Sequence, residues 1–209
     1  MLDKQGFDLW ADGYDKTVQV SEENGVYPFA GYKAILSTIF NEVMGKENAR
    51  VLDIGFGTGF MTSRLYEHGH KIDGIDFSSK MIAMAQAKMP NANLIEWDIT
   101  GGLPSEINTK KYDFIVSTYA LHHLTDVEKV KFIQALLPML EEEGKILIGD
   151  IAFCTSQELE ACKEDCRESW DEDEFYFVFD ELSPSLKDYC RLKFKAISHC
   201  GGIIEITRK

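Results

Sequence analysis

Residues 51–60 place the strongest constraint on what this chain can fold into. They form a short apolar run around one acidic residue, followed by glycines at alternate positions. Such a run predicts a strand buried on both faces, as in a parallel sheet. The glycines let the backbone turn tightly and leave it open to close approach by a ligand. They are Gly55, Gly57 and Gly59.

A helical pattern follows the glycines and ends near Gly69, a residue suited to cap a helix C-terminus. The free N–H groups at the start of this helix would face the glycine loop. Strand, loop and helix together predict a binding corner of the kind used for nucleotides.

Strand-like and helical patterns alternate from residue 50 onward, which predicts a parallel sheet with right-handed crossovers. The tail differs, because its last two strand-like segments are separated by only a few residues. So short a link permits only an antiparallel hairpin. We therefore expect one α/β domain over residues 1–209, with a doubly wound, mostly parallel, seven-stranded sheet and one antiparallel strand. The predicted strands cover residues 51–54, 71–75, 93–97, 112–117, 145–151, 191–198 and 203–208.

Residues 1–45 precede the predicted sheet. Phe7, Trp10 and Tyr14 fall at helical spacing and give a short helix an aromatic stripe. Such a stripe usually packs against a core, although Tyr14 is also a candidate to cover a ligand site. A second, amphipathic helix is predicted over residues 30–45, so we interpret the whole segment as a helical lid.

Residues 157–183 interrupt the alternation. Eleven acidic residues share this segment with only Lys163 and Arg167. A charge run of this kind is usually a solvated helix face. Aromatic residues stand among the acids, however, so part of the segment must pack. We expect this acidic insertion to lie near the site where the substrate that accepts a chemical group binds. That site would be on the side of the sheet that the strand-end loops leave open.

Composition narrows the function further. The net charge of −13 disfavours a nucleic-acid partner, and no apolar run approaches the roughly 20 residues of a membrane span. The chain also begins without a secretory signal pattern, which leads us to expect a cytoplasmic protein. Five cysteines without such a signal favour reduced thiols. Cys162 and Cys166 would share a helix face, but no second pair with matching spacing is present, so no metal site is expected.

Acidic residues end three consecutive predicted strands: Asp53, Asp76 and Asp98. Ligands of open α/β sheets bind at the carboxyl ends of the strands, so these carboxylates should converge on one crevice. Asp76 lies 21 positions after Gly55, a spacing that suits a carboxylate bonded to ribose hydroxyls. The alternative for each aspartate is to cap the helix that follows it.

The glycine spacing discriminates between nucleotides. A dinucleotide fingerprint is Gly-x-Gly-x-x-Gly and presents N–H groups to a pyrophosphate. Here the spacing is Gly-x-Gly-x-Gly, with Asp53 two residues before the first glycine. A carboxylate would repel a pyrophosphate but suits a ligand with a cationic end, such as S-adenosylmethionine. A nicotinamide-dependent oxidoreductase is therefore the weaker alternative.

Five motifs in order resemble the signatures of class I S-adenosylmethionine-dependent methyltransferases, whose fold is Rossmann-like. The resemblance covers about residues 45–209, and residues 10–15 and 200–202 are further similar to small bacterial YrrT-like methyltransferases. Several ordered motifs are far more specific than one glycine loop. The motifs cover residues 51–59, 74–78, 96–99, 114–124 and 144–148.

The resemblance implies roles at the methionine end of the cofactor. Asp53 would orient the loop and, through water, the amino group, and the carbonyl oxygen of Ser117 would meet the ammonium. Thr58 and Tyr14 are further candidates for cofactor binding. The positions that would pass close under the methionine are Gly55, Gly57 and Gly59.

The resemblance also implies roles at the nucleoside end. Asp76 would bind both ribose hydroxyls, with Phe77 beside the adenosine. Asp98 would accept a hydrogen bond from the adenine amino group, and the backbone of Ile99 would donate one to the ring. Met81 would pack on the adenine face.

The implied reaction is an in-line displacement in which an acceptor atom attacks the sulfonium methyl group. A general base is needed only if the acceptor proton has a high pKa. His122 is the nearest candidate for that base, although the pair His122-His123 is equally typical of packing at a helix start. The expected partner is a small-molecule acceptor. A non-catalytic binder of S-adenosylmethionine or S-adenosylhomocysteine remains the alternative.

Overall fold

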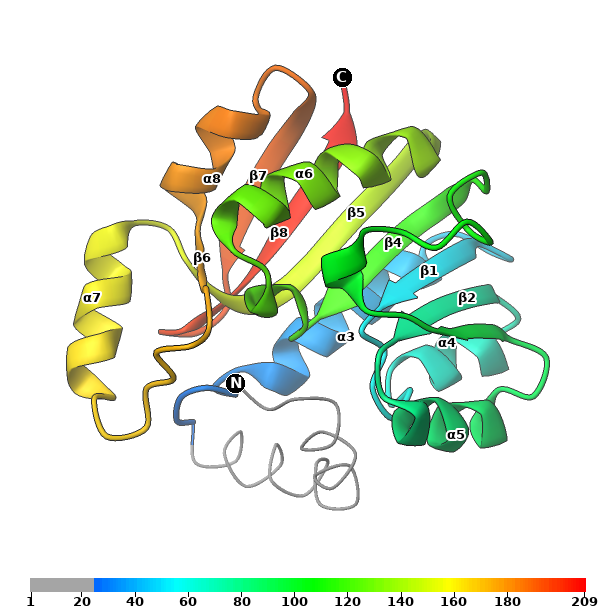
Figure 1. Cartoon of the computed structure of the whole chain (residues 1–209), viewed down its shortest axis with the longest axis horizontal. Helices are drawn as coiled ribbons and strands as arrows, with labels where there is room; N and C mark the ends of the chain where they lie inside the picture. Colours follow the sequence, from blue (N-terminus) through cyan, green and yellow to red (C-terminus); the bar gives the residue numbers. More distant parts are fainter. Residues whose placement is uncertain (1–24) are drawn as a thin grey trace.

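The computed structural model describes residues 25–209, with a mixed sheet at their centre (Figure 1). The strand order is β3-β2-β1-β4-β5-β8-β7. Strands β1 to β5 run parallel, and β8 pairs antiparallel with both β5 and β7. The strands are β1 (Arg50–Ile54), β2 (Lys71–Asp76), β3 (Asn93–Glu96), β4 (Tyr112–Thr118), β5 (Leu140–Phe153), β6 (Phe177–Val178), β7 (Cys190–Ala196) and β8 (Gly201–Arg208).

The mostly parallel sheet and its antiparallel hairpin confirm the predicted fold, but the sheet has eight strands rather than seven. The additional strand, β6, comes from the acidic insertion and pairs parallel with Ala152 and Phe153. This pairing is possible because β5 extends to Phe153, beyond the predicted end at residue 151.

Helices cover both faces of the sheet, as a doubly wound fold requires (Figure 1). Alternate residues of β1 enter two separate cores: Val51 packs on the side of α3, α4 and α5, whereas Leu52 and Ile54 pack on the side of α6 and α8. The helices are α3 (Tyr32–Met44), α4 (Thr62–Glu67), α5 (Ser79–Lys88), α6 (Asp126–Leu136), α7 (Ser156–Asp165) and α8 (Phe179–Leu186), with single 3₁₀ turns η1 (Ile99–Gly101), η2 (Leu121–His123) and η3 (Leu137–Met139).

Local sequence signals explain several helix ends. Thr125 and Glu128 form a reciprocal capping box at the start of α6, and Thr155 and Glu158 form another at α7. The helix α6 ends at Leu136, ahead of the proline in η3. These short-range bonds fix where the two helices begin.

The helix α3 confirms the amphipathic helix predicted over residues 30–45. It lies directly on β5, because a Cβ atom on Gly149 would be only 2.3 Å from Cγ2 of Ile35. The aromatic helix predicted around Phe7, Trp10 and Tyr14 lies outside the described residues. Between residues 25 and 209, every helix is too short or too polar to cross a membrane.

Candidate active site

The glycine loop follows β1 and turns back under the ends of the strands. Gly55, Gly57 and Gly59 all have left-handed φ angles, of 70°, 56° and 71°. A Cβ atom on Gly55 would lie 2.3 Å from Cβ of Ala120, so the loop touches the segment that follows β4. A Cβ atom on Gly57 would meet nothing within 4 Å. The backbone at Gly57 therefore faces open space that a ligand can approach.

Asp53 is buried beneath this loop. The Thr62 hydroxyl donates to its Oδ2 atom, whereas its buried Oδ1 atom has no hydrogen-bond partner in residues 25–209. Burial raises the pKa of Asp53 to about 7; the bond from Thr62 opposes this shift and the charge of Asp76 adds to it. Asp53 lines a hollow together with Gly57 and Tyr32. A cationic group in that hollow would complete the hydrogen bonding of the carboxylate and favour its ionised form.

Asp76 shapes the loop from the neighbouring strand. Its two carboxylate oxygens accept hydrogen bonds from the backbone N–H groups of Gly57, at 2.8 Å, and Ser78, at 2.9 Å. Each oxygen of an ionised carboxylate can accept a second bond. The side chain thus holds the glycine loop in place, at the strand end where a ribose is expected.

Asp98 follows the third strand, which ends earlier than predicted. Its Oδ1 atom accepts hydrogen bonds from the backbone N–H of Thr100, at 2.9 Å, and from the Thr100 hydroxyl, at 2.8 Å. This is the capping arrangement that we considered as the alternative, and it places Ile99 at the first position of η1. Asp98 and Ile99 therefore lie at the same edge of the sheet as Asp76, where the parallel strands end.

The other predicted cofactor residues cluster around the same strand ends. The Ser117 hydroxyl donates to the carbonyl of Ile54 at 2.9 Å, which joins the ends of β4 and β1. Met81 is buried, and its N–H donates to the Ser78 hydroxyl that caps α5. Phe77 is half-buried, Thr58 is buried, and Tyr14 lies outside the described residues.

His122 lies buried in η2 with a carboxylate on each side of its ring. Its Nδ1 atom is 2.6 Å from Oδ1 of Asp150, and its Nε2 atom is 3.6 Å from Oε1 of Glu174. Burial disfavours the imidazolium, but the charge and hydrogen bond of Asp150 outweigh it, so the pKa of His122 is raised above 6.5. A neutral His122 that donates from Nδ1 to Asp150 keeps its lone pair on Nε2. The pair can therefore accept a proton at Nε2.

Sequence reasoning missed Asp150 and Glu174. Asp150 stands near the end of a predicted strand, the same signal that identified the earlier strand-end aspartates. Glu174 lies in the acidic insertion, and only the fold brings it to His122. The backbone confirms this approach, since the N–H of Phe175 donates to the carbonyl of His122 at 2.8 Å.

Aromatic side chains border the same region. Trp170 of the insertion stacks on Tyr27, with ring centroids 5.1 Å apart and planes 14° apart. The hydroxyls of Tyr27 and Tyr176 share a hydrogen bond. Tyr119, which has an unusual positive φ of 51°, contacts the rings of Phe29 and Tyr32. Backbone strain of this kind is concentrated at functional sites.

A larger hollow of about 600 Å³ lies at the opposite, amino ends of β1, β2 and β3. It is lined in part by Asp73, whose carboxylate already accepts bonds from Lys110, Tyr112 and Asn93. Open α/β sheets bind their ligands at the carboxyl ends instead. The glycine loop is therefore the better candidate for a cofactor site.

The glycine loop fits the cofactor that the sequence predicted. The unpartnered Oδ1 atom of Asp53 suits a cationic amino group, and the open face of Gly57 accommodates a close ligand. The carboxylates of Asp76 and Asp98 follow along the same edge toward the place expected for ribose and adenine.

Comparisons with known proteins agree with this chemistry. A family model described as a methyltransferase domain matches residues 51–144. An uncharacterized methyltransferase from Geobacillus sp. (strain WCH70) is 34% identical over 204 residues, covering 97% of this chain and 91% of the relative. Another, from Alkaliphilus oremlandii (strain OhILAs), is 31% identical over 185 residues, covering 88% and 82% of the two chains.

Solved structures share the fold. A complex of DhpI with S-adenosylhomocysteine aligns with a TM-score of 0.72 at 16% identity, covering 98% of this chain and 94% of that chain. Magnesium protoporphyrin IX methyltransferase from Synechocystis PCC 6803, with bound S-adenosylhomocysteine, aligns with a TM-score of 0.69 at 18% identity, covering 99% and 100%. The chain therefore belongs to the class I S-adenosylmethionine-dependent methyltransferases, and S-adenosylmethionine is its cofactor.

Proposed function

We propose that the protein methylates a small molecule whose reacting atom carries a proton, and that His122 removes that proton. The observation that carries this proposal is the buried contact of 2.6 Å between His122 and Asp150. The base lies close to the cofactor loop, because Ala120, two residues earlier, is the residue that Gly55 touches. A general base positioned beside the cofactor site can accept the acceptor's proton during transfer.

The proposed reaction moves one methyl group and one proton. The bound cofactor supplies a methyl group on a positively charged sulfur, which leaves as S-adenosylhomocysteine. The acceptor atom forms its new bond to the methyl carbon as the carbon–sulfur bond breaks, and its proton passes to Nε2 of His122. Asp150 holds the ring by Nδ1 and stabilises the imidazolium that forms.

We further propose how the chain holds the cofactor. Asp53 and the carbonyl of Ser117 would take the amino group, with Gly55, Gly57, Thr58 and Gly59 beneath the methionine. The buried Asp53 oxygen without a partner supports this assignment. The residues proposed at the nucleoside end are Asp76, Phe77, Met81, Asp98 and Ile99, and Tyr14 stays a candidate from the predicted lid.

We also propose that the acceptor carries a cationic group near its reacting atom. Glu174 presents a half-buried carboxylate beside His122, and the rings of Trp170, Tyr27 and Tyr176 lie next to it. Carboxylates and aromatic faces both attract cations, most strongly where water is excluded. The exposed acids elsewhere in the insertion contribute little to this preference.

The test is a screen of acceptors that measures S-adenosylhomocysteine as the common product. Once an acceptor is found, we expect His122→Asn to lower kcat by about 10²- to 10⁴-fold while the affinity for S-adenosylmethionine is unchanged. The control is His68→Asn, which changes an exposed histidine directly after α4 and should retain activity.

Three results would contradict these proposals. Full turnover in His122→Asn would show that His122 is not the general base. Tight cofactor binding with no product from any acceptor would favour the non-catalytic alternative. An acceptor found only among anions would contradict the preference for a cationic group.

A further inference from the structure

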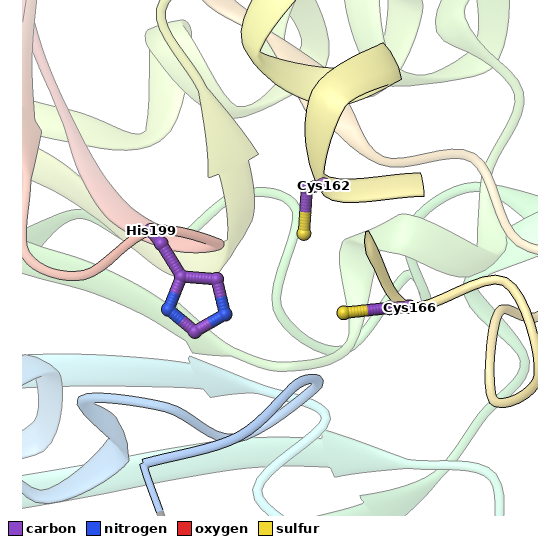
Figure 2. A group of neighbouring side chains, drawn as sticks. All are labelled: Cys162, Cys166 and His199. Atoms are coloured by element: carbon purple, nitrogen blue, oxygen red, sulfur yellow. The ribbon is translucent and has the colours of Figure 1, made fainter. Parts of the chain in front are cut away.

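Three metal-binding groups come together at a place remote from the cofactor loop. Cys162 lies in the last turn of α7, Cys166 caps that helix, and His199 lies in the turn between β7 and β8. Their ligand atoms, two sulfurs and a ring nitrogen, all lie within 4.8 Å of one another. Figure 2 shows the three side chains directed toward the same space.

Sequence spacing explains only two of the three ligands. Cys162 and Cys166 are four residues apart and therefore face the same side of the helix end. His199 follows more than thirty residues later and reaches them because the C-terminal hairpin folds back beside α7. The sequence shows no second ligand pair with matching spacing, which is why we expected no metal there.

We propose that Cys162, Cys166 and His199 bind one Zn²⁺ ion, with water as the fourth ligand. Thiolate and imidazole are the ligands that zinc prefers, in tetrahedral geometry. Zinc bond lengths place such ligand atoms about 3.5–3.8 Å apart. Small rotations of the three side chains from their present separation therefore suffice, and the exposed position of His199 admits water.

Cys200 follows His199 but is not one of the three proposed ligands. The sulfur of this buried thiol lies 3.8 Å from the carbonyl of Pro28 and 4.0 Å from the Ser198 hydroxyl. Its hydrogen-bonding contacts are therefore with residues 28 and 198. Water is consequently the better candidate for the fourth position.

A disulfide between Cys162 and Cys166 is the main alternative. The polar His199 beside both sulfurs has no function in a disulfide, whereas it completes a zinc site.

The proposed ion would fix the acidic insertion in place. Trp170, which stacks on Tyr27, follows Cys166 by four residues. On the other side, the Ser198 hydroxyl donates to the carbonyl of Ala30 at 2.6 Å. Zinc would therefore join the insertion, the hairpin turn and the segment before α3, three parts of the chain that meet beside the His122 region. Its role is structural.

The test uses the full-length protein, purified under reducing conditions and stripped of metal. We expect one equivalent of Zn²⁺ to bind, and Co²⁺ in its place to give thiolate-to-cobalt charge-transfer absorption. Cys166→Ser and His199→Asn should each weaken zinc binding, measured by chelator competition, by at least about 10-fold, the lower bound known for residues that only support ligands. Cys154→Ser, a half-buried cysteine outside the group, is the matched control and should bind zinc as the unaltered protein does.

Any of three results would overturn the proposal: substoichiometric zinc at saturation, unchanged affinity in both ligand variants, or a Cys162–Cys166 disulfide in protein isolated without reductant. These measurements report metal directly. They therefore stand or fall independently of the methyl acceptor and of the role of His122.

Discussion

Asp53 and Asp150 are both buried, and each has one carboxylate oxygen without a hydrogen-bond partner in the described part of the chain. The chain holds the other oxygen of each, through the Thr62 hydroxyl for Asp53 and through His122 for Asp150. An unsatisfied buried acceptor costs about 1–3 kcal/mol. Such a cost is understandable where a ligand or a catalytic proton completes the bonding.

Replacing Asp150 should change the pH dependence of methyl transfer. The base must be neutral to accept a proton, so turnover rises with pH through the raised pKa of His122, with a midpoint above 6.5. In Asp150→Asn the attraction is lost, and we expect a lower midpoint and a plateau reduced by about 10²- to 10⁴-fold. Lys129, Glu174 and the neighbouring His123 are unchanged in this variant. A kcat profile against pH that keeps its midpoint would contradict the pairing.

Asp53 should make cofactor affinity depend on pH. A cationic ligand binds the ionised carboxylate better, so affinity should rise as pH increases through about 7, the pKa of Asp53. The cofactor amino group stays charged below about pH 7.7, which sets the upper end of the useful range. Calorimetry across this range should show the dependence, and Asp53→Asn should bind more weakly and with little change with pH. If cofactor affinity in Asp53→Asn still depended strongly on pH, the titrating group would be a residue other than Asp53.

The residues that sequence could identify are those whose signal is local. Asp53 and Asp76 stand at fixed spacings from the glycines, so their convergence followed from strand geometry. Asp150 carried the same signal near the end of the fifth strand. Glu174 became a neighbour of His122 only through a long-range contact, which no spacing in the sequence records.

At the scale of elements, the glycine loop and the segment after β4 form one unit. Gly55 and Ala120 are in close contact, so the loop proposed to bind the cofactor packs directly against the segment that leads to His122. The pairing of β1 with β4 places Ile54 opposite Ser117, so the strands that lead into these two segments are also held side by side.

Gly55→Ala should therefore damage both stability and binding. The new methyl group would lie 2.3 Å from Cβ of Ala120, and such overpacking costs about 1–3 kcal/mol of unfolding free energy. Gly57→Ala is the matched comparison, because it has the same left-handed φ without any neighbour within 4 Å. Denaturant titration should show the larger loss in Gly55→Ala. Equal losses would mean that backbone conformation alone decides.

The helix α6 holds the acidic insertion through one buried lysine. Lys129 donates to the carbonyls of Phe175 and Tyr176 and to Asp126 at 2.9 Å, and it lies over the ring of Phe177. A buried ammonium with these partners explains how an acidic segment stays against the sheet.

Lys129→Met should loosen the insertion. Hydrogen bonds to a charged group contribute about 1.5–3 kcal/mol, so we expect an unfolding free energy lower by that amount. Hydrogen exchange should increase over residues 170–178, and turnover should fall while cofactor affinity holds. Lys131→Met, an exposed change on the same helix, is the control. Unaltered exchange over residues 170–178 would show that the insertion is held elsewhere.

Elements were predictable to the extent that their signals were short-range. The capping box of Thr125 and Glu128 marked the start of α6 without any knowledge of the fold. The strand β6 could not be found this way, because two residues form a strand only when a distant partner pairs with them. The extension of β5 to Phe153 accompanies the same pairing.

The whole molecule has two cores on a shared sheet. Both contain residues of β1, β4 and β5, so neither core can unfold while the other keeps an intact sheet. The general arrangement followed from sequence, since alternating strands and helices allow few topologies. The approach of the hairpin turn to α7 did not, because it depends on how the ends of β5 and β8 pack in three dimensions.

Cofactor binding should stabilise the molecule as one unit. S-adenosylhomocysteine at about 100 times its Kd should raise the unfolding free energy by about 2.7 kcal/mol. Calorimetry should show a single transition that shifts upward with ligand. Asp76→Ala should show a smaller shift at the same concentration, because it loses the proposed ribose contact. Two transitions, only one of them moved by ligand, would contradict the shared sheet.

The strand β6 anchors the acidic insertion to the sheet, and the residues proposed for the cofactor and for the acceptor come from different parts of the chain. Described groups proposed for the cofactor come from residues 53–117, whereas the aromatic rings and Glu174 come from residues 27–32, 119 and 170–176. Under the proposed function, the stretch between β5 and α8, which is held at both ends, can therefore vary with the acceptor while the residues proposed for the cofactor stay unchanged.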